Sequence, residues 1–122
     1  MAIDDDAAKN GSKVLTKPSP YNLSSSDNPG AMISPIMLTE DNYVEWAKEM
    51  QNALQAKRKT CFINGFLVKP SSTDPDFENW QTDNSMIVGW IRASIEPKVK
   101  STVTVIDEAY QSWNELKQRF SV

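Results

Sequence analysis

The chain has 122 residues, of which 39% are hydrophobic and 24% are charged, so it has room for one globular domain. It contains one cysteine and no histidine, which excludes a disulfide framework, zinc knuckles and any catalytic site built on an imidazole base. The net charge is −3 and no segment is densely basic, which disfavours nucleic-acid binding. We therefore expect no metal and no other cofactor.

The N-terminal part of the sequence is predicted to be a flexible tail over residues 1–30. It is rich in aspartate, lysine, serine and proline, and all eleven aromatic residues of the chain lie at or after Tyr21. Its acidic start does not fit a secretory signal and the chain has no run of 18 apolar residues, so we expect a cytoplasmic protein without a membrane span. The apolar run 31–38 contains a proline and is predicted to be an edge strand or an extended lead-in.

A first amphipathic helix is predicted to begin at Tyr43. Asn42 followed by Glu45 has the spacing of a capping box. The apolar residues that follow share one face, about 120° wide. The basic run at residues 57–59 places positive charge at the negative end of the helix dipole.

A turn and a second helix follow. Asn64-Gly65 lies between two short apolar groups, which predicts a small hairpin or an extended loop. Asp74 as N-cap and Pro75 at the first helical position predict the start of a helix, whose apolar stripe ends at Ile95.

Two apolar side chains of this second helix, Met86 and Trp90, point away from its stripe. Either the helix is central and buried on both sides, or these two residues form an exposed interaction face. Gly89 lies between them and lets another element approach the backbone closely, which fits both explanations.

The last part of the sequence is predicted to hold a short helix within residues 98–105 and a final helix capped by Asp107. The chain stops at Val122 without a glycine or proline stop signal, which predicts truncation at the C-terminus. The expected fold is mostly α: a small domain of about four helices over residues 31–122, after the tail of residues 1–30.

Candidate sites are few. Acidic pairs such as Glu40-Asp41 lie at helix starts, where they complement the dipole, so we expect no catalytic site. Aromatic residues three apart on an apolar helix face, as in Tyr43 and Trp46, belong to the core in most proteins and stack on a ligand in fewer. The predicted core signature is Tyr43, Trp46, Met50, Leu54, Trp80, Trp113, Leu116 and Phe120.

Seven short motifs follow one another along the chain. They are Tyr21 with Asp27, Pro29 and Gly30; Leu38; Asn42-Tyr43 with Trp46, Met50 and Leu54; Phe62-Ile63-Asn64-Gly65; Pro70 with Trp80; Trp90-Ile91; and Ala109, Trp113 and Leu116 with Arg119-Phe120-Ser121. In type and order they resemble the N-terminal Gag region of copia-type LTR retrotransposons, a family found in many plant genomes. The resemblance extends from Tyr21 to the end of the chain.

The resemblance implies a structural protein whose helical, capsid-like domain self-associates into a shell around the RNA of the element, its reverse transcriptase and its integrase. RNA binding in the family lies mainly in a later zinc knuckle, which these residues do not contain, so nucleic acid is not assigned to them. The partner is expected to be the chain itself.

An RNA-binding or host-adopted interaction adaptor is the alternative. The RNA-binding form needs the cations of the chain to converge in space, whereas the simpler interpretation of the basic run is a solvated helix end. The residues concerned are Lys57, Arg58 and Lys59, as weak RNA contacts, with Lys98 and Lys100.

Overall fold

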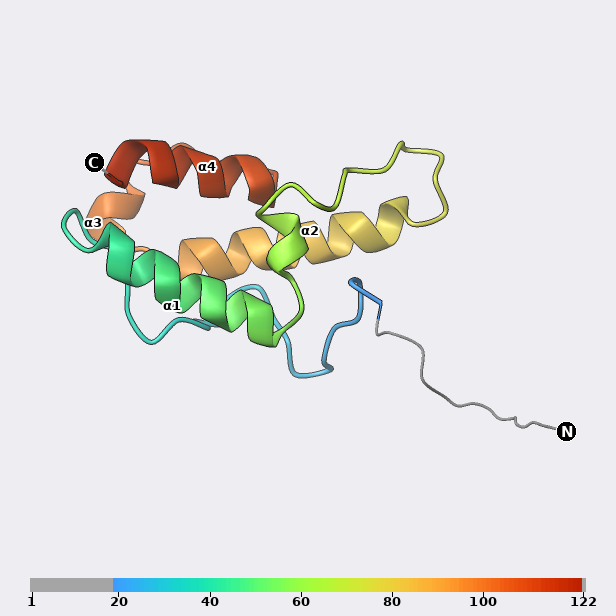
Figure 1. Cartoon of the computed structure of the whole chain (residues 1–122), viewed down its shortest axis with the longest axis horizontal. Coiled ribbons are helices and arrows are strands. Elements are labelled where there is room, and N and C mark those ends of the chain that lie inside the picture. The colour runs from blue at the N-terminus through green and yellow to red at the C-terminus, as the bar shows by residue number, and fades with distance from the viewer. Residues whose placement is uncertain (1–18, 122) are drawn as a thin grey trace, which may run out of the picture.

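The computed structural model describes residues 19–121, and its described part is mostly helical, which confirms the predicted fold class (Figure 1). None of its helices is long and apolar enough to cross a membrane. The elements are α1 (Tyr43–Ala56), the 3-10 helix η1 (Thr60–Phe62), α2 (Phe77–Ala93), α3 (Pro97–Lys100) and α4 (Ala109–Phe120).

The three long helices enclose one core, with α2 between α1 and α4 in the view of Figure 1. Trp46 of α1 stacks on Trp113 of α4 with 5.5 Å between ring centroids, and its Nε1 donates a hydrogen bond to Ser94 Oγ at 3.2 Å. Ser94 directly follows α2, so Trp46 joins all three helices. Because its indole N–H has a partner, this buried side chain leaves no unpaired donor in the core.

Residues 31–38 form no strand: the chain bends at residues 34–36, and only Leu38 pairs with another segment, in an isolated parallel bridge with Ile95. Helix α1 begins at Tyr43 as predicted, but the capping box is wrong. The Asn42 side chain caps no helical N–H; its Oδ1 accepts from the Thr39 N–H at 2.7 Å, and its Nδ2 donates to the Met37 carbonyl at 2.9 Å. Asn42 therefore fixes the lead-in loop.

The structure has neither the predicted hairpin nor the predicted extended loop between residues 60 and 70, but a compact turn. Gly65 has the turn conformation, with φ of 86°. The residues before it form η1, however, and the Leu67 N–H donates to the Cys61 carbonyl at 3.1 Å. This compact turn leaves no pair of strands between residues 60 and 70.

Two predicted helix caps are wrong. Helix α2 begins at Phe77 rather than Pro75, because the Asp74 carboxylate accepts from the Asp76 N–H at 2.8 Å and prolongs the turn. Helix α4 is capped from another helix: Asn84 Oδ1 accepts from the Ala109 N–H at 2.8 Å. Asp107 contributes only its carbonyl, which accepts from Asn84 Nδ2 at 2.6 Å.

The short helix predicted within residues 98–105 is present as α3, which starts at Pro97 and ends at Lys100. The chain then turns, since the Thr102 and Val103 N–H groups donate to the carbonyls three residues earlier. The β-branched run after Lys100 therefore forms a connection, with no further helix before α4.

The leading segment, residues 19–30, packs on α1 and α2. Lys59 Nζ donates to the carbonyls of Pro20 at 2.7 Å and Asn22 at 2.5 Å. Trp90 Nε1 donates to the Asn28 carbonyl at 2.8 Å. The sequence predicts a flexible tail for residues 1–30, but the structure packs residues 19–30 against the helical part of the molecule. The first eighteen residues of the predicted tail lie outside the described part.

Candidate interaction surfaces

The predicted core signature lies inside the molecule. Seven of its eight residues are at most 9% exposed, and Phe120 is partly buried and packs against the same cluster. The rings of Tyr43 and Trp46 are neighbours, with 6.1 Å between their centroids. Burial raises the pKa of the Tyr43 hydroxyl. Trp46 thus has no free face for a ligand, and its stacking partner is Trp113.

Met86 and Trp90, the predicted interaction face, do not form one. Trp90 is completely buried, and Met86 is partly buried against the core. The element that covers this side of α2 is the leading segment: a Cβ placed on Gly89 would lie 2.5 Å from both Cβ and the carbonyl oxygen of Pro29. Helix α2 is therefore buried on both sides.

Lys59 differs from the other two cations of the basic run because its side chain is buried, with only 1% of it exposed. Its Nζ lies 3.5 Å from Asp83 Oδ2, and Asp83 is buried as well. Burial raises the pKa of the Asp83 carboxyl, and the nearby Lys59 cation opposes this shift. Lys59 thus anchors the leading segment inside the molecule and cannot serve as a solvated cation.

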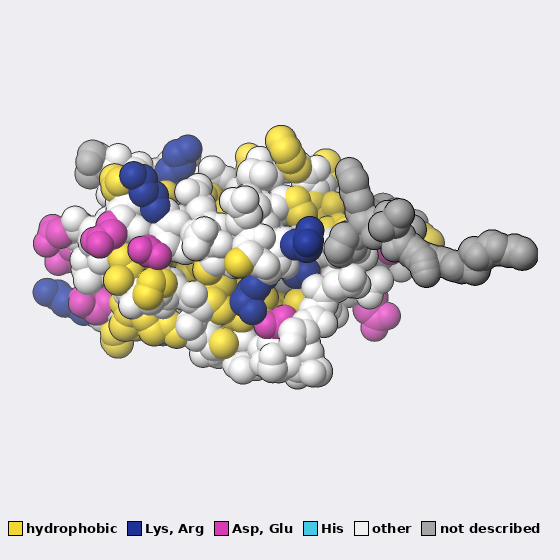
Figure 2. Space-filling view, turned by 60° about the horizontal axis from the view of Figure 1, so that its bottom comes forward, with side chains coloured by type: hydrophobic (Ala, Val, Ile, Leu, Met, Phe, Trp, Pro, Cys, Tyr) yellow, Lys and Arg dark blue, Asp and Glu magenta, His cyan; other side chains and the backbone are white. Residues whose placement is uncertain are grey.

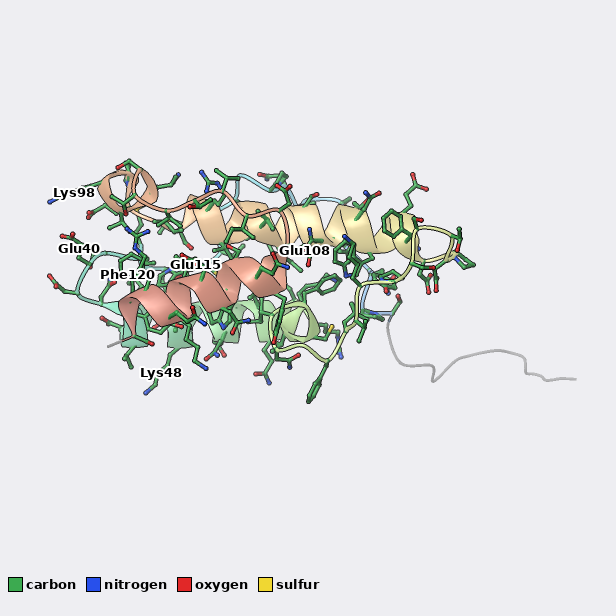
Figure 3. The ribbon with its side chains drawn as sticks, turned by 90° about the horizontal axis from the view of Figure 1, so that it is seen from above. Glu40, Lys48, Lys98, Glu108, Glu115 and Phe120 are labelled. Atoms are coloured by element: carbon green, nitrogen blue, oxygen red, sulfur yellow. The ribbon has the colours of Figure 1, made fainter. Side chains whose placement is uncertain are left out.

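The other cations are not gathered with it. Lys57 pairs with Asp27 at 2.8 Å and lies 4.8 Å from the centre of the Trp90 ring. Arg58 is exposed at the turn after α1, with φ of 60°. Lys98 and Lys100 lie on α3, at the end of the molecule where α1 begins (Figures 1 and 3). The five cations do not converge.

A first exposed apolar surface, which we call the loop surface, consists of Phe66, Val68 and Tyr110. These side chains are 85%, 78% and 49% exposed. Val68 and Tyr110 line one small pocket of about 260 Å³. Phe66 directly follows Gly65, whose backbone lies against the Tyr110 ring, since a Cβ placed on Gly65 would be 3.2 Å from that ring.

The loop surface is held in place by polar contacts. Lys69 Nζ lies 3.2 Å from Glu108 Oε2 and 5.3 Å from the centre of the Trp80 ring. The Phe66 N–H donates to Asn64 Oδ1 at 2.9 Å. The apolar side chains therefore project from a loop that is tied to α2 and to Glu108, the residue before α4, which sequence periodicity could not reveal.

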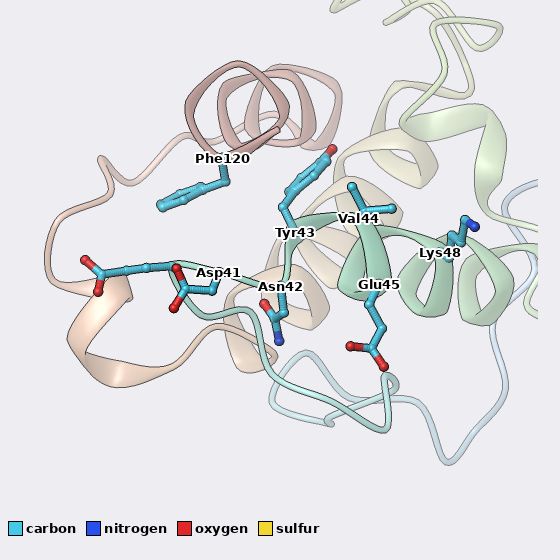
Figure 4. Close-up of a pocket in the computed structure, with 8 residues that line it drawn as sticks. Asp41, Asn42, Tyr43, Val44, Glu45, Lys48 and Phe120 are labelled. Carbon is cyan, nitrogen blue, oxygen red and sulfur yellow. The ribbon is translucent and has the colours of Figure 1, made fainter. Parts of the chain in front are cut away.

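A second surface, which we call the end pocket, lies where α1 begins and α4 ends (Figure 4). It has a volume of about 670 Å³, and its apolar residues are Tyr43, Val44 and Phe120. Val44 is 65% exposed. Figure 2 shows acidic side chains beside apolar atoms at this end of the molecule. The charged residues that line the pocket are Glu40, Asp41, Glu45 and Lys48.

The described residues offer little chemistry. They contain no group of three or more histidine, cysteine, aspartate or glutamate side chains placed to hold a metal ion. Cys61 is partly buried, and burial raises the pKa of its thiol, which disfavours the reactive thiolate.

Residues 24–71 match the family model described as Gag-polypeptide of LTR copia-type. This match confirms the resemblance over a stretch that contains most of the leading segment, α1, η1 and two residues of the loop surface. No curated protein and no solved structure matches the chain.

Proposed function

We propose that this chain, in which residues 24–71 are a copia-type Gag region, is a structural protein that self-associates into a capsid-like particle and performs no catalysis. The observation that carries the proposal is the loop surface. Phe66 is 85% exposed, although burying a Phe side chain contributes about 1.5–3 kcal/mol. Phe66 is joined on the same loop by Val68, and several exposed apolar side chains on one surface are typical of a contact site for another protein.

Assembly does not require a large interface. Shells are built from many repeated contacts, so each one can bury less than the ~1,200 Å² of a stable pair. A loop with two exposed apolar side chains beside an exposed tyrosine has the size for such a weak contact. The charge distribution supports a protein partner, because the cations do not form a platform for phosphates.

The test is light scattering and electron microscopy of the purified chain over a range of concentrations. We expect oligomers or particles for the parent and loss of both for Phe66→Asp. Met32→Asp is the matched control, since Met32 is also exposed, at 47%, and the change adds the same charge outside the loop surface. A parent that stays monomeric at every concentration would contradict the proposal and favour an adaptor for another protein.

A further inference from the structure

We infer that Phe66 of one copy inserts into the end pocket of a second copy, so that the chains associate head to tail. The inference rests on the proposed self-association and names the two surfaces that meet. It assigns a partner to each exposed apolar surface described above, with a second copy of this chain as the occupant.

Phe66 has the properties of an inserting side chain. It is the most exposed large hydrophobic residue of the described part of the chain, at 85%. The turn that presents it is fixed by the positive φ of Gly65 and by the hydrogen bond from the Phe66 N–H to Asn64 Oδ1. Little conformational freedom of the backbone is therefore lost when the ring enters a partner.

The end pocket has the complementary properties. Its volume of about 670 Å³ lies within the range of ~300–1,000 Å³ that accommodates compact ligands, and one aromatic ring with its neighbours fits this space. Figure 4 shows Phe120 projecting from α4 on the side of Asp41, whereas Tyr43 projects from the start of α1 toward α4. A ring that enters there meets the exposed Val44, the partly buried Phe120 and the small exposed part of Tyr43, which is 9% exposed.

The charges around the two surfaces favour this pairing over a symmetric contact between two end pockets. Three carboxylates and one lysine line the end pocket, a net charge of −2. The stretch from residue 57 to residue 69, which carries Phe66, holds four cations and no acid. Lys57 and Lys69 have acidic partners within the chain and Lys59 is buried, so Arg58 carries the exposed excess. Two end pockets would repel each other, whereas the copy that supplies Phe66 has an exposed cation on this stretch, Arg58 at the turn after α1.

The positions of the two surfaces determine what the contact builds. The end pocket is at the start of α1, whereas the loop surface follows its end, and the 14 residues of the helix span about 21 Å. Figure 3 likewise places Glu108, which anchors the loop surface, away from Glu40 and Phe120. A contact between two different surfaces repeats from copy to copy and gives rings or open arrays.

The experiment uses two variants of the whole chain, Phe66→Asp and Val44→Asp, each of which removes one of the two surfaces. Both side chains are exposed, and an acid at the second position of α1 is compatible with the helix dipole, so both variants should fold. Circular dichroism checks this, and Val44→Gln replaces Val44→Asp if helix is lost. We expect each variant alone to be monomeric, with the association constant reduced at least tenfold.

The decisive measurement is sedimentation of an equimolar mixture of Phe66→Asp and Val44→Asp. Phe66→Asp keeps an intact end pocket and Val44→Asp keeps an intact loop surface, so the two variants can form one contact. We therefore expect a 1:1 complex that grows no further. Two results overturn the inference and leave the proposed function in place: Val44→Asp assembling like the parent, or a mixture that stays monomeric while the parent assembles. A parent that never assembles overturns both.

Discussion

Gly89→Ala should destabilise this protein, although the same change in an exposed helix stabilises. Gly89 lies inside α2, where alanine is favoured over glycine by about 1 kcal/mol. Here, however, the new Cβ would lie 2.5 Å from the Pro29 carbonyl oxygen and 2.9 Å from its carbonyl carbon. Because these are backbone atoms, no rotation of a side chain relieves the clash, and the leading segment has to move.

The magnitude follows from what the movement breaks. Overpacking a fitted contact costs about 1–3 kcal/mol. Displacing the segment also separates the buried Trp90 Nε1 from the Asn28 carbonyl, and an unpaired buried donor costs about 1–3 kcal/mol. Even the smaller total of about 2 kcal/mol exceeds the gain in helix propensity. We therefore expect a net loss of at least about 1 kcal/mol, which lowers the melting temperature by about 4–8 °C.

The assay is thermal and urea unfolding followed by tryptophan fluorescence. Gly30→Ala is the matched control, because a Cβ at Gly30 meets only Asn28 Oδ1, at an ordinary 3.5 Å. We expect the control to unfold like the parent, or slightly later. If Gly89→Ala melts above the parent, as propensity alone predicts, then the leading segment does not lie against α2.

Three further changes test the core and its charged contacts. Trp46→Ala should cost about 3–5 kcal/mol by urea titration, because a fully buried indole is removed, and a parent-like midpoint would show it exposed. Lys59→Met should cost about 3–5 kcal/mol because it leaves Asp83 buried without its cation. Adding Asp83→Asn to this variant should recover part of the lost stability. If the losses of the two single variants simply add in the double variant, the pairing of Lys59 with Asp83 is contradicted. For Asp27, burial alone would raise the pKa of the carboxyl, but the hydrogen bonds from Lys57 and from the Ser24 N–H, together with the charges of Lys57 and Lys59, outweigh burial and lower the pKa. Its stabilisation is therefore present above about pH 4 and lost as pH falls through the lowered value. Asp27→Asn should therefore be less stable than the parent at pH 7, with the difference shrinking below pH 4, and a constant difference would contradict the role of its charge.

The long helices could be predicted from the sequence because apolar periodicity reports directly which face is buried. Their caps could not, because a cap depends on which partner is within reach in space. Asn42 has the spacing of a capping box, yet its side-chain amide forms hydrogen bonds with the backbone of Met37 and Thr39. The first N–H of α4 is satisfied by Asn84, 25 residues earlier, and no local pattern encodes that pairing.

The basic run shows the same limit for the candidate sites. Local sequence makes Lys59 equivalent to Lys57 and Arg58, but the carbonyls of Pro20 and Asn22 converge on its ammonium group from a segment that composition describes as a tail. A short polar segment can pack when a few buried donors satisfy its carbonyls, although it contributes little apolar surface. The charge pattern of the sequence predicts an exposed Lys59 because it contains no information on backbone carbonyls that approach from a distant segment.

The match at residues 24–71 covers α1 and η1, yet it does not contain the elements that cover their apolar side. Trp46 is buried by Trp113 and Ser94, both beyond residue 71. The two exposed surfaces are composite in the same way. Phe66 and Val68 belong to the matched stretch and Tyr110 to α4, while Val44 belongs to the matched stretch and Phe120 to α4. Helix α4 thus both closes the core and completes each surface, so a change in its packing against α1 would alter the core and both proposed contacts together.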